Sequence, residues 1–335
     1  SRQSGIQINN APGNYVGDGT AAGRNVLSGN GASSPGGGID IVGVNSLNNF
    51  VLGNYIGTDE TGNTYVGNEG IGIEVRNGAS YTTIGGASVL DRNVVSGNNY
   101  IAGIFFSNGG SYNTIEGNYV GVGADGSTSI PNNGNGVRVT DANSLFNTIS
   151  ANIINNNTGR GITLGCGNNN KDFPVILSET ATTISGTCES GDIIEVFDAG
   201  TGDQGQTYLG TAVTTGTTWS LTGTFNTSNN FTATATAANG NTSEFSRLDG
   251  SSPPAPPVTP STQVSGLVSS NYRQNRASVD WTNGNGNRRL VVASTSPITW
   301  TPTDDVIYND NSNYGNGASL VATDTYVIYE GSSNS

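Results

Sequence analysis

Residues 5–30 of the chain read GIQINNAPGNYVGDGTAAGRNVLSGN, and residues 72–98 repeat this stretch as GIEVRNGASYTTIGGASVLDRNVVSGN with one inserted residue. Arg24 and Asn25 of the first copy align with Arg92 and Asn93 of the second. The stretch between them is repeated as well, since GIDIVGVNSLNNFVLGNYIG from residue 38 returns as GIFFSNGGSYNTIEGNYVG from residue 103. Repetition at such long intervals is typical of proteins built from stacked structural units.

Each unit opens with a glycine followed by a branched apolar residue, and six such pairs follow one another at intervals of about 25 to 34 residues. The pairs begin at Gly5, Gly38, Gly72, Gly103, Gly136 and Gly161. Inside each unit, short runs such as GIDI and NVVSGN alternate apolar and polar residues, and glycine and asparagine separate the runs. This alternation has the period of a half-buried β-strand, and no window has the spacing of an amphipathic helix.

A short strand cannot bury its apolar side alone, so the sequence predicts that successive units stack as the coils of a parallel β-helix. We expect residues 1–172 to form about six coils, each rising about 4.8 Å. One inward column would hold Ile6, Ile39, Ile73, Ile104, Val137 and Ile162, and the next Ile8, Ile41, Val75, Phe106, Val139 and Leu164. At equivalent corners, a structural ladder of amides is expected from Asn54, Asn93, Asn118 and Asn152.

The composition limits the function. The chain has 335 residues with 50 glycines, no histidine and a net charge of −13. The missing histidine excludes a Ser-His-Asp or Cys-His nucleophile and a histidine-bound metal, and we expect no metal or cofactor. The thinly spread negative charge argues against nucleic acid or an anionic membrane as a partner. No run of 18 apolar residues exists, so no membrane span is expected.

Cys166 and Cys188 are the only cysteines. In a polar chain rich in threonine, glycine and asparagine, they suggest a disulfide formed outside the cytoplasm, closing a loop of about twenty residues. The alternative is two buried free thiols.

The repeat stops after Asn170 and a different pattern begins. Residues 173–250 contain seven short alternating runs with turn signals between them, the number and spacing of an immunoglobulin-like β-sandwich. Trp219 is the expected core residue. In the turn at 198–203, Asp198, Gly202 and Asp203 lack the regular spacing of a calcium loop, which favours a plain polar turn over a calcium site.

Residues 251–260, SSPPAPPVTP, predict a stiff proline-rich linker. Beyond it, ASVDWT and RRLVVAS flank the turn NGNGN and predict a β-hairpin, with Trp281 placed to fill a second sandwich. About five strands are expected in residues 261–335, fewer than the seven of a typical sandwich. We therefore expect this module to be incomplete. The repeat is already under way at Gly5 without an atypical capping coil, so we expect the native chain to continue in both directions, or a partner chain to cover the exposed edges.

The strings NTIEGNYVG, NYIGTDETGN and RNVVSGN resemble the right-handed parallel β-helix repeats of large bacterial surface proteins. GNTSEFS is similar to the end of the immunoglobulin-like module that often follows such repeats, and WTNGNGNRRLVVAS with YVIYEG resembles a fibronectin type III-like module. Modules of this kind occur in proteins exported by the type IX secretion route. The resemblance implies an extracellular or cell-surface protein, adhesin-like or associated with gliding, whose partners include the export machinery and other parts of one large protein.

Two acidic residues are candidates for chemistry. The outward positions of the Gly-Ile strand are Gln7, Asp40, Glu74, Phe105, Arg138 and Thr163 in successive coils. Asp40 and Glu74 are therefore expected side by side on an exposed sheet, with Arg138 as the nearest cation. Two carboxyl groups about 5 Å apart match a retaining glycosidase pair, but stacked repeats also place like side chains in register without any catalytic role.

Exposed tyrosines are candidates for binding. The residue after the corner asparagine is expected to point outward, which places Tyr55 and Tyr119 two coils apart and Tyr15 at the equivalent place in the other unit. Aromatic rings on a flat sheet can stack on sugars, although strands also accept tyrosine for its β-propensity alone. The loops 58–69 and 122–135 are where a binding site would be elaborated.

Three functions follow from these features. The first is a non-enzymatic extracellular protein used for attachment to a polysaccharide or to a host or neighbouring cell surface. The second is a polysaccharide-degrading enzyme that uses Asp40 and Glu74. The third is an architectural segment of a surface filament or secretion substrate.

Overall fold

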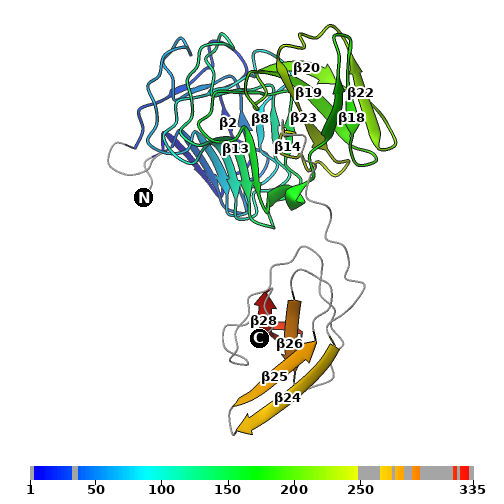
Figure 1. The fold of residues 1–335 in the computed structure, drawn as a ribbon. Coiled ribbons are helices and arrows are strands. Elements are labelled where there is room, and N and C mark those ends of the chain that lie inside the picture. Colours follow the sequence, from blue (N-terminus) through cyan, green and yellow to red (C-terminus); the bar gives the residue numbers. More distant parts are fainter. Residues whose placement is uncertain are drawn as a thin grey trace. The chain divides into compact units, whose positions relative to one another are not determined.

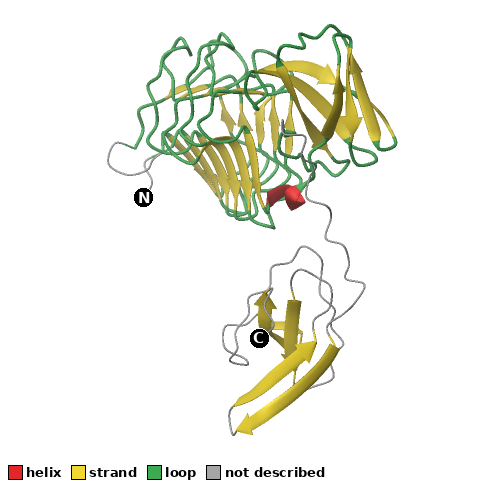
Figure 2. Cartoon of the chain, viewed as in Figure 1, coloured by secondary structure: helices red, strands yellow, loops and turns green. Residues whose placement is uncertain are grey.

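The computed structural model describes residues 4–31 and 37–247, together with the backbone of five strands between residues 265 and 331. The chain divides into two compact units, residues 1–254 and 255–335. Apart from one short 3-10 helix, every regular element in the described residues is a β-strand (Figure 2). The predicted all-β class is therefore confirmed.

Three parallel sheets build the first part of the chain (Figure 1). The first sheet holds β1 (Ile6–Asn9), β4 (Ile39–Val42), β7 (Ile73–Arg76), β10 (Ala102–Ser107), β13 (Asn135–Thr140) and β16 (Ile162–Gly165). The second holds β2 (Tyr15–Val16), β5 (Phe50–Val51), β8 (Thr83–Gly85), β11 (Thr114–Glu116) and β14 (Thr148–Ser150). The third holds β3 (Val26–Leu27), β6 (Tyr55–Ile56), β9 (Val94–Val95), β12 (Tyr119–Val120) and β15 (Ile153–Ile154).

These sheets form the predicted parallel β-solenoid, in which each of the first five coils gives one strand to each sheet. Every predicted Gly-Ile or Gly-Val pair lies at or inside a strand of the first sheet. The sixth pair leads into β16 alone, since no strand of the second or third sheet follows it. The solenoid therefore has fewer complete turns than the six pairs suggested.

The two predicted inward columns are confirmed by the strand register. Ile39 pairs with Ile6 on one side and Ile73 on the other, and Ile41 likewise pairs with Ile8 and Val75. From the second coil onward these side chains are almost fully buried, except for the half-buried Leu164 at the end of the column. Each apolar column is continuous because parallel in-register pairing places equivalent residues of neighbouring coils directly beside one another.

The predicted asparagine ladder is present and is one of three. Asn93 donates from Nδ2 to Oδ1 of Asn118 at 2.9 Å, and Asn118 repeats this bond to Asn152 at 3.0 Å. The first ladder comprises Asn25, Asn54, Asn93, Asn118 and Asn152; the second comprises Asn30, Asn68, Asn98, Asn132 and Asn157. The third is interrupted by Thr82 and comprises Asn14, Asn49, Asn113 and Asn147. The ladders satisfy buried backbone groups at the corners of the coils.

Two antiparallel sheets follow the solenoid within the same compact unit (Figure 1). One holds β17 (Val175–Glu179), β18 (Thr183–Thr187), β22 (Thr218–Thr222) and β21 (Val213–Thr215). The other holds β20 (Thr207–Thr211), β19 (Ile193–Gly200) and β23 (Asn230–Thr236). Buried residues of both sheets share one apolar core, in which Trp219 is 2% exposed and lies with Ile184 and Phe231. The predicted core role of Trp219 is confirmed.

The antiparallel sheets close the last coil of the solenoid. Phe197 of β19 and Phe245 belong to the apolar core of the solenoid and meet edge to face at 5.4 Å. The last strands of the second and third sheets donate from their backbone N–H groups. Ile149 donates to the hydroxyl of Thr242 at 2.9 Å, and Ile154 donates to the carbonyl of Gly205 at 3.0 Å. These contacts satisfy strand edges that stacking would otherwise leave open.

The expected disulfide between Cys166 and Cys188 is absent, and both residues are free cysteines. Cys166 has a left-handed backbone (φ 67°) before the 3-10 helix η1 (Gly167–Asn170), whereas Cys188 packs against the core shared by the antiparallel sheets. The number of cysteines and the polar composition of the chain suggested the bond, and neither feature shows where the two side chains lie. The end of the solenoid is joined to the antiparallel sheets by the packing and hydrogen bonds of the closing contacts.

In the second unit, β24 (Ser265–Arg273) pairs with β25 (Arg276–Thr282), and β26 (Arg289–Ser294) pairs with β28 (Thr325–Gly331). β27 (Leu320–Ala322) completes the second of these sheets. The predicted hairpin between ASVDWT and RRLVVAS is therefore wrong. β25 pairs instead with the strand before it, from which it is separated by a shorter connection. The linker 251–260 and the side chain of Trp281 lie outside the described residues.

Candidate functional site

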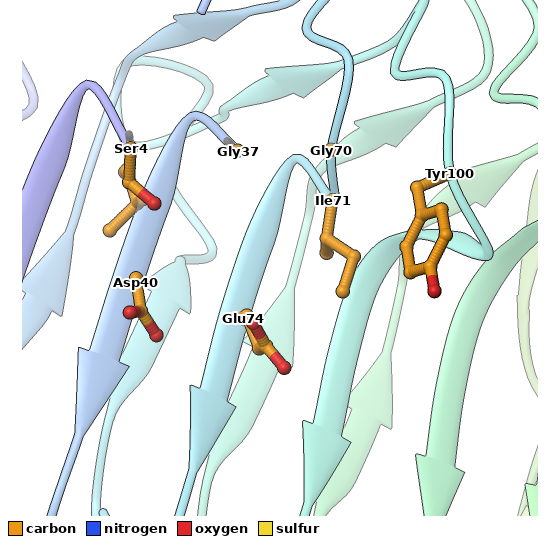
Figure 3. A pocket seen from close by; sticks show the side chains of 8 residues that line it. Ser4, Gly37, Asp40, Gly70, Ile71, Glu74 and Tyr100 are labelled. Atoms are coloured by element: carbon orange, nitrogen blue, oxygen red, sulfur yellow. The ribbon is translucent and has the colours of Figure 1, made fainter. Parts of the chain in front are cut away.

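Asp40 and Glu74 lie side by side on the outer face of the first solenoid sheet. The register pairs Gln7 with Asp40, Asp40 with Glu74 and Glu74 with Phe105, so the predicted outward column is confirmed. Figure 3 shows the two carboxyl groups on adjacent strands, β4 and β7. The parallel coils thus bring together two acidic residues that are 34 positions apart in sequence.

The surroundings of this pair differ from the expectation of an exposed sheet. Asp40 is 1% exposed and Glu74 is 6% exposed. Arg76 donates to both oxygens of Asp40, from Nε at 3.0 Å and from Nη2 at 2.9 Å, and its Nε lies 3.6 Å from Oε2 of Glu74. Gln7 Nε2 donates a further bond to Asp40 at 2.8 Å. Arg76 is therefore the cation of the site.

The expected cation Arg138 lies elsewhere, over the ring of Phe105 at 5.7 Å. Sequence reasoning missed Arg76 because its contact is diagonal. Asp40 of β4 pairs directly with Glu74 of β7, and Arg76 lies two residues after Glu74 on the same strand. The hydrogen bonds to Asp40 raise the pKa of Arg76 above its ordinary value, despite an opposing effect of burial. Both oxygens of Asp40 are committed to donors, whereas the general acid of a glycosidase must hold a proton and release it.

The pair borders a small pocket of about 100 Å³, here called the carboxylate pocket (Figure 3). Its lining residues are Ser4, Gly37, Ile39, Asp40, Gly70, Ile71, Glu74 and Tyr100. Tyr100 is 45% exposed at the rim, and Ile71 is buried. Fixed acceptors beside an apolar side chain and an aromatic ring suit a ligand that carries both hydroxyl groups and C–H surface, as sugars do.

The three candidate tyrosines do not form one surface. Tyr55 is only 8% exposed, because Arg24 lies 4.2 Å from its ring centroid and the loop at Gly62 folds against the ring. Tyr119 is half-buried under Arg92, at 4.0 Å, with the loop at Gly126 over its hydroxyl end. The expected exposed sugar-stacking patch of Tyr55 and Tyr119 is therefore wrong. The loops predicted to elaborate a site cover these rings instead.

Tyr15 belongs to the second sheet, whereas Tyr55 and Tyr119 belong to the third, so the expected equivalence is also wrong. Tyr15 is 64% exposed and stacks on Phe50 with ring centroids 4.5 Å apart. The strings NYVG at 14–17 and NYIG at 54–57 are nearly identical although they belong to different sheets, and this likeness hid the difference.

A different aromatic cluster went unnoticed in the sequence. Tyr81, Tyr112 and Phe146 stack in successive coils just before the second sheet, with ring centroids 5.0 and 4.7 Å apart. We call these three residues the aromatic ladder. Each of these residues lies two positions before the first paired residue of its strand in the second sheet, Thr83, Thr114 or Thr148. An alignment of the coils on these strands, rather than on the corner asparagines, would have placed them together.

In the turn at 198–203, Asp198 is held by hydrogen bonds within the antiparallel part of the chain. Both oxygens of Asp198 accept hydrogen bonds from Asn229, and one also accepts from the backbone of Gly200. Within residues 4–31 and 37–247, no cluster of three or more acidic, cysteine or histidine side chains is arranged to hold a metal ion. In the same described part of the chain, no helix is long and apolar enough to cross a membrane.

Comparisons with known proteins add no family assignment. The chain matches no protein-family model, and comparison with curated proteins gives no significant match.

Proposed function

We propose that this protein is a non-enzymatic, adhesin-like protein of the bacterial cell surface, which attaches to saccharides through the carboxylate pocket of its β-solenoid. The solenoid provides the frame, because every residue of the pocket is carried by strands or turns of stacked coils. Export through the type IX route and membership of a larger gliding-associated or adhesive protein belong to the same proposal, which for these points rests on the sequence resemblance described above.

The observation that carries the proposal is the fixed state of Asp40. Arg76 and Gln7 hold its carboxylate through three hydrogen bonds of 2.8 to 3.0 Å. Such a network orients neighbouring polar groups and loses little conformational entropy when a ligand binds. Because both oxygens of Asp40 accept hydrogen bonds, Asp40 is poorly placed to donate a proton as the general acid of a glycosidase. The arrangement suits recognition better than acid–base chemistry.

For the antiparallel sheets, we propose an immunoglobulin-like sandwich that joins the solenoid to the second unit. The shared core around Trp219 supports this assignment. For the second unit, we propose a fibronectin type III-like module. Both modules would act as spacers between the solenoid and the rest of a longer surface protein.

The second candidate function is a polysaccharide-degrading enzyme, favoured by the in-register pairing of Asp40 with Glu74. A third is an architectural segment, favoured by the continuous asparagine ladders. A glycan array and an assay of reducing-sugar release separate the three. Glycan binding without release supports the proposed function, release supports the enzyme, and neither supports the architectural segment.

The pocket is tested with Glu74→Gln and Tyr100→Ala in the full chain. Matched controls are Glu69→Gln and Tyr65→Ala, which change exposed residues outside the pocket. We expect each pocket variant to weaken array binding by about tenfold or more, the loss that removal of one charged hydrogen bond or aromatic contact produces. The controls should bind as the wild type does. Equal binding by pocket and control variants would remove the pocket from the proposal.

If reducing sugar is released, its loss in Asp40→Asn with Glu74→Gln would assign the activity to this pair. Thermal melting followed by circular dichroism should accompany each variant, because Asp40 is part of a buried ion pair. A variant that has the melting temperature of the wild type but releases no sugar has lost the catalytic groups while keeping its fold.

A further inference from the structure

One turn position of the solenoid has a left-handed backbone in five successive coils. It lies two residues before the start of the second-sheet register, and it is occupied by Gly13 (φ 71°), Asn48 (φ 54°), Tyr81 (φ 58°), Tyr112 (φ 56°) and Phe146 (φ 61°). Glycine and asparagine tolerate this conformation, whereas an aromatic residue is strained in it. The last three coils therefore place aromatic side chains where the backbone disfavours them.

Burial does not account for these aromatic residues. Tyr81 is 50% exposed and Tyr112 is 48% exposed, so half of each side chain remains in water. Their rings lie nearly parallel, 10° apart in plane, which offsets part of the backbone strain. The strain is kept although Asn48 shows that the same turn forms without an aromatic ring. Strained residues that persist at a surface commonly serve a binding role.

The neighbouring column of the same turn presents amide groups. Asn77 and Asn108 follow the strands of the first sheet, are exposed, and are linked by a hydrogen bond of 3.2 Å from Nδ2 to Oδ1. Asn48, which occupies the position of the aromatic ladder in the second coil, is exposed too. The only charged residue in this column is Asp141, beside the coil of Phe146, where its carboxylate accepts from the backbone of Asn108. The surface around Tyr81 and Tyr112 is therefore aromatic and amide-rich, and its one carboxylate, that of Asp141, lies at the end nearest Phe146.

This surface is separate from the carboxylate pocket. The pocket lies where chain segments enter the first sheet, at Gly37 and Ile71, whereas the aromatic ladder lies beyond the ends of the same strands. Two sites at opposite ends of the strands cannot be one cavity. A variant of one can thus leave the other unchanged.

We propose that the aromatic ladder, with Asn48, Asn77 and Asn108, binds a neutral polysaccharide chain that runs along the solenoid axis. The inference extends the proposed saccharide-binding function to a second site and rests on that function for the class of ligand. Ring edges and tyrosine hydroxyls contact sugar C–H groups and hydroxyls, and the amides donate and accept further hydrogen bonds. Because neighbouring coils are about 4.8 Å apart, the ladder repeats its contacts at roughly the length of one sugar unit.

The mutual stacking of the rings prepares this surface for binding. Each ring is held by its neighbour, so its rotamers are restricted before the ligand arrives and little further order is needed. On one side the ladder ends at Phe146, whose backbone N–H donates to Asn241 of the closing sheets. Toward earlier coils it continues into Asn48 and Gly13, which leaves room for a chain longer than the three rings.

The test is affinity electrophoresis of the full chain in gels that contain a soluble mannan, xylan or mixed-linkage β-glucan. The double variant Tyr81→Asn with Tyr112→Asn removes both rings and installs the residue that the second coil already uses at this turn. Tyr65→Asn, an exposed tyrosine in the loop 58–69, is the control. We expect the wild type and the control to be retarded by at least one polysaccharide, and the double variant to bind about tenfold more weakly.

A second measurement does not depend on the folding of a variant. In the wild type, nitration by tetranitromethane should modify Tyr81, Tyr112 and Tyr65, and bound polysaccharide should protect the first two but not Tyr65. Equal retardation of the double variant and the wild type, or equal nitration with and without polysaccharide, would overturn the ladder site while leaving the pocket intact. Absence of retardation of the wild type in every gel would overturn the ladder site. A glycan array without any binding would overturn the proposed function itself.

Discussion

Gln204 of the antiparallel part occupies the place of the next asparagine in the second ladder of the solenoid. Its Oε1 accepts hydrogen bonds from the backbone N–H and from Nδ2 of Asn157, both at 3.2 Å, and its Nε2 donates to the carbonyl of Asn157 at 2.9 Å. Asn168 ends the third ladder in the same way, because its Oδ1 accepts from the backbone of Asn147 at 3.0 Å. The closing residues therefore imitate a further coil.

Replacing Gln204 by alanine should lower the free energy of unfolding by about 1–3 kcal/mol, because the buried backbone N–H and carbonyl of Asn157 lose the hydrogen bonds that Gln204 gives them. Chemical denaturation followed by circular dichroism measures the change. Gln206→Ala is the control, since Gln206 is exposed and lies outside the ladder. Equal losses in the two variants would contradict the closing role of Gln204.

Ile73→Asp should destabilise the solenoid by about 3–5 kcal/mol, because it places a carboxyl group in a column where Ile73 is fully buried. Glu74→Gln, on the opposite face of the same strand, should change stability by less than about 1 kcal/mol, since an amide can still bond with Arg76. Thermal and urea denaturation compare the two. Similar losses would contradict the inward and outward assignment of β7.

Arg76→Ala should lower stability by about 2–3 kcal/mol, because Asp40 is buried and would lose both guanidinium hydrogen bonds. Arg138→Ala removes an arginine from the same sheet, one that lies over Phe105 and forms no ion pair with Asp40, and it should cost less. Urea denaturation of both variants gives the comparison. A larger loss for Arg138 would show that ring packing outweighs the ion pair.

Glu195 makes the junction sensitive to pH. Burial raises its pKa above the ordinary value of 4.5, although hydrogen bonds from Ser150 and the backbone of Ala151 oppose this effect. The folded protein thus holds the proton more tightly than the unfolded chain. Stability is therefore lost as pH rises from 4.5 through the raised folded value and is retained below 4.5.

In Glu195→Gln this loss should disappear. The free energy of unfolding of the wild type, minus that of the variant, is expected to fall as the pH rises above 4.5 and then to level off. Glu60→Gln, a change at an exposed residue, should leave the pH dependence of stability as it is in the wild type. A difference between wild type and Glu195→Gln that stays constant over this range would contradict the assignment.

Both cysteines should react as thiols. Denatured without reductant, each chain is expected to consume two equivalents of Ellman's reagent, one for Cys166 and one for Cys188. In the native protein Cys188 should react slowly, because burial raises the pKa of its thiol. A linked peptide of the two cysteines in mass spectrometry would contradict the free state.

The sequence was sufficient to predict the features that follow from the stacking of equivalent coils. The period of the Gly-Ile pairs fixed the register, and the register fixed the buried columns and the neighbours Asp40 and Glu74. It was insufficient wherever side chains leave the column of their own coil. Arg76 reaches diagonally to Asp40, and Arg24 folds over Tyr55. Such contacts depend on side-chain rotamers and on inserted loops, to which alternation of apolar and polar residues is insensitive.

The junction was beyond prediction for a similar reason. Gln204 and Asn157 are 47 residues apart, and they meet only because the antiparallel part folds back onto the last coil. The change of pattern after Asn170 indicated a new architecture, but two architectures can be joined by a linker or packed into one unit. Gln204 is a glutamine outside the repeat, so the pattern of asparagines in the coils did not predict that its side chain would continue the second ladder.

The imitation of a coil by Gln204 and Asn168 has a consequence for how the gene can change. The closing residues recognise asparagines that recur in other coils, so any coil that ends in equivalent amides presents the same surface to them. Duplication or loss of one whole coil would then alter the length of the solenoid without requiring new closing residues, because each coil contacts only its neighbours. Related chains that differ in length by whole repeats would carry the record of such events.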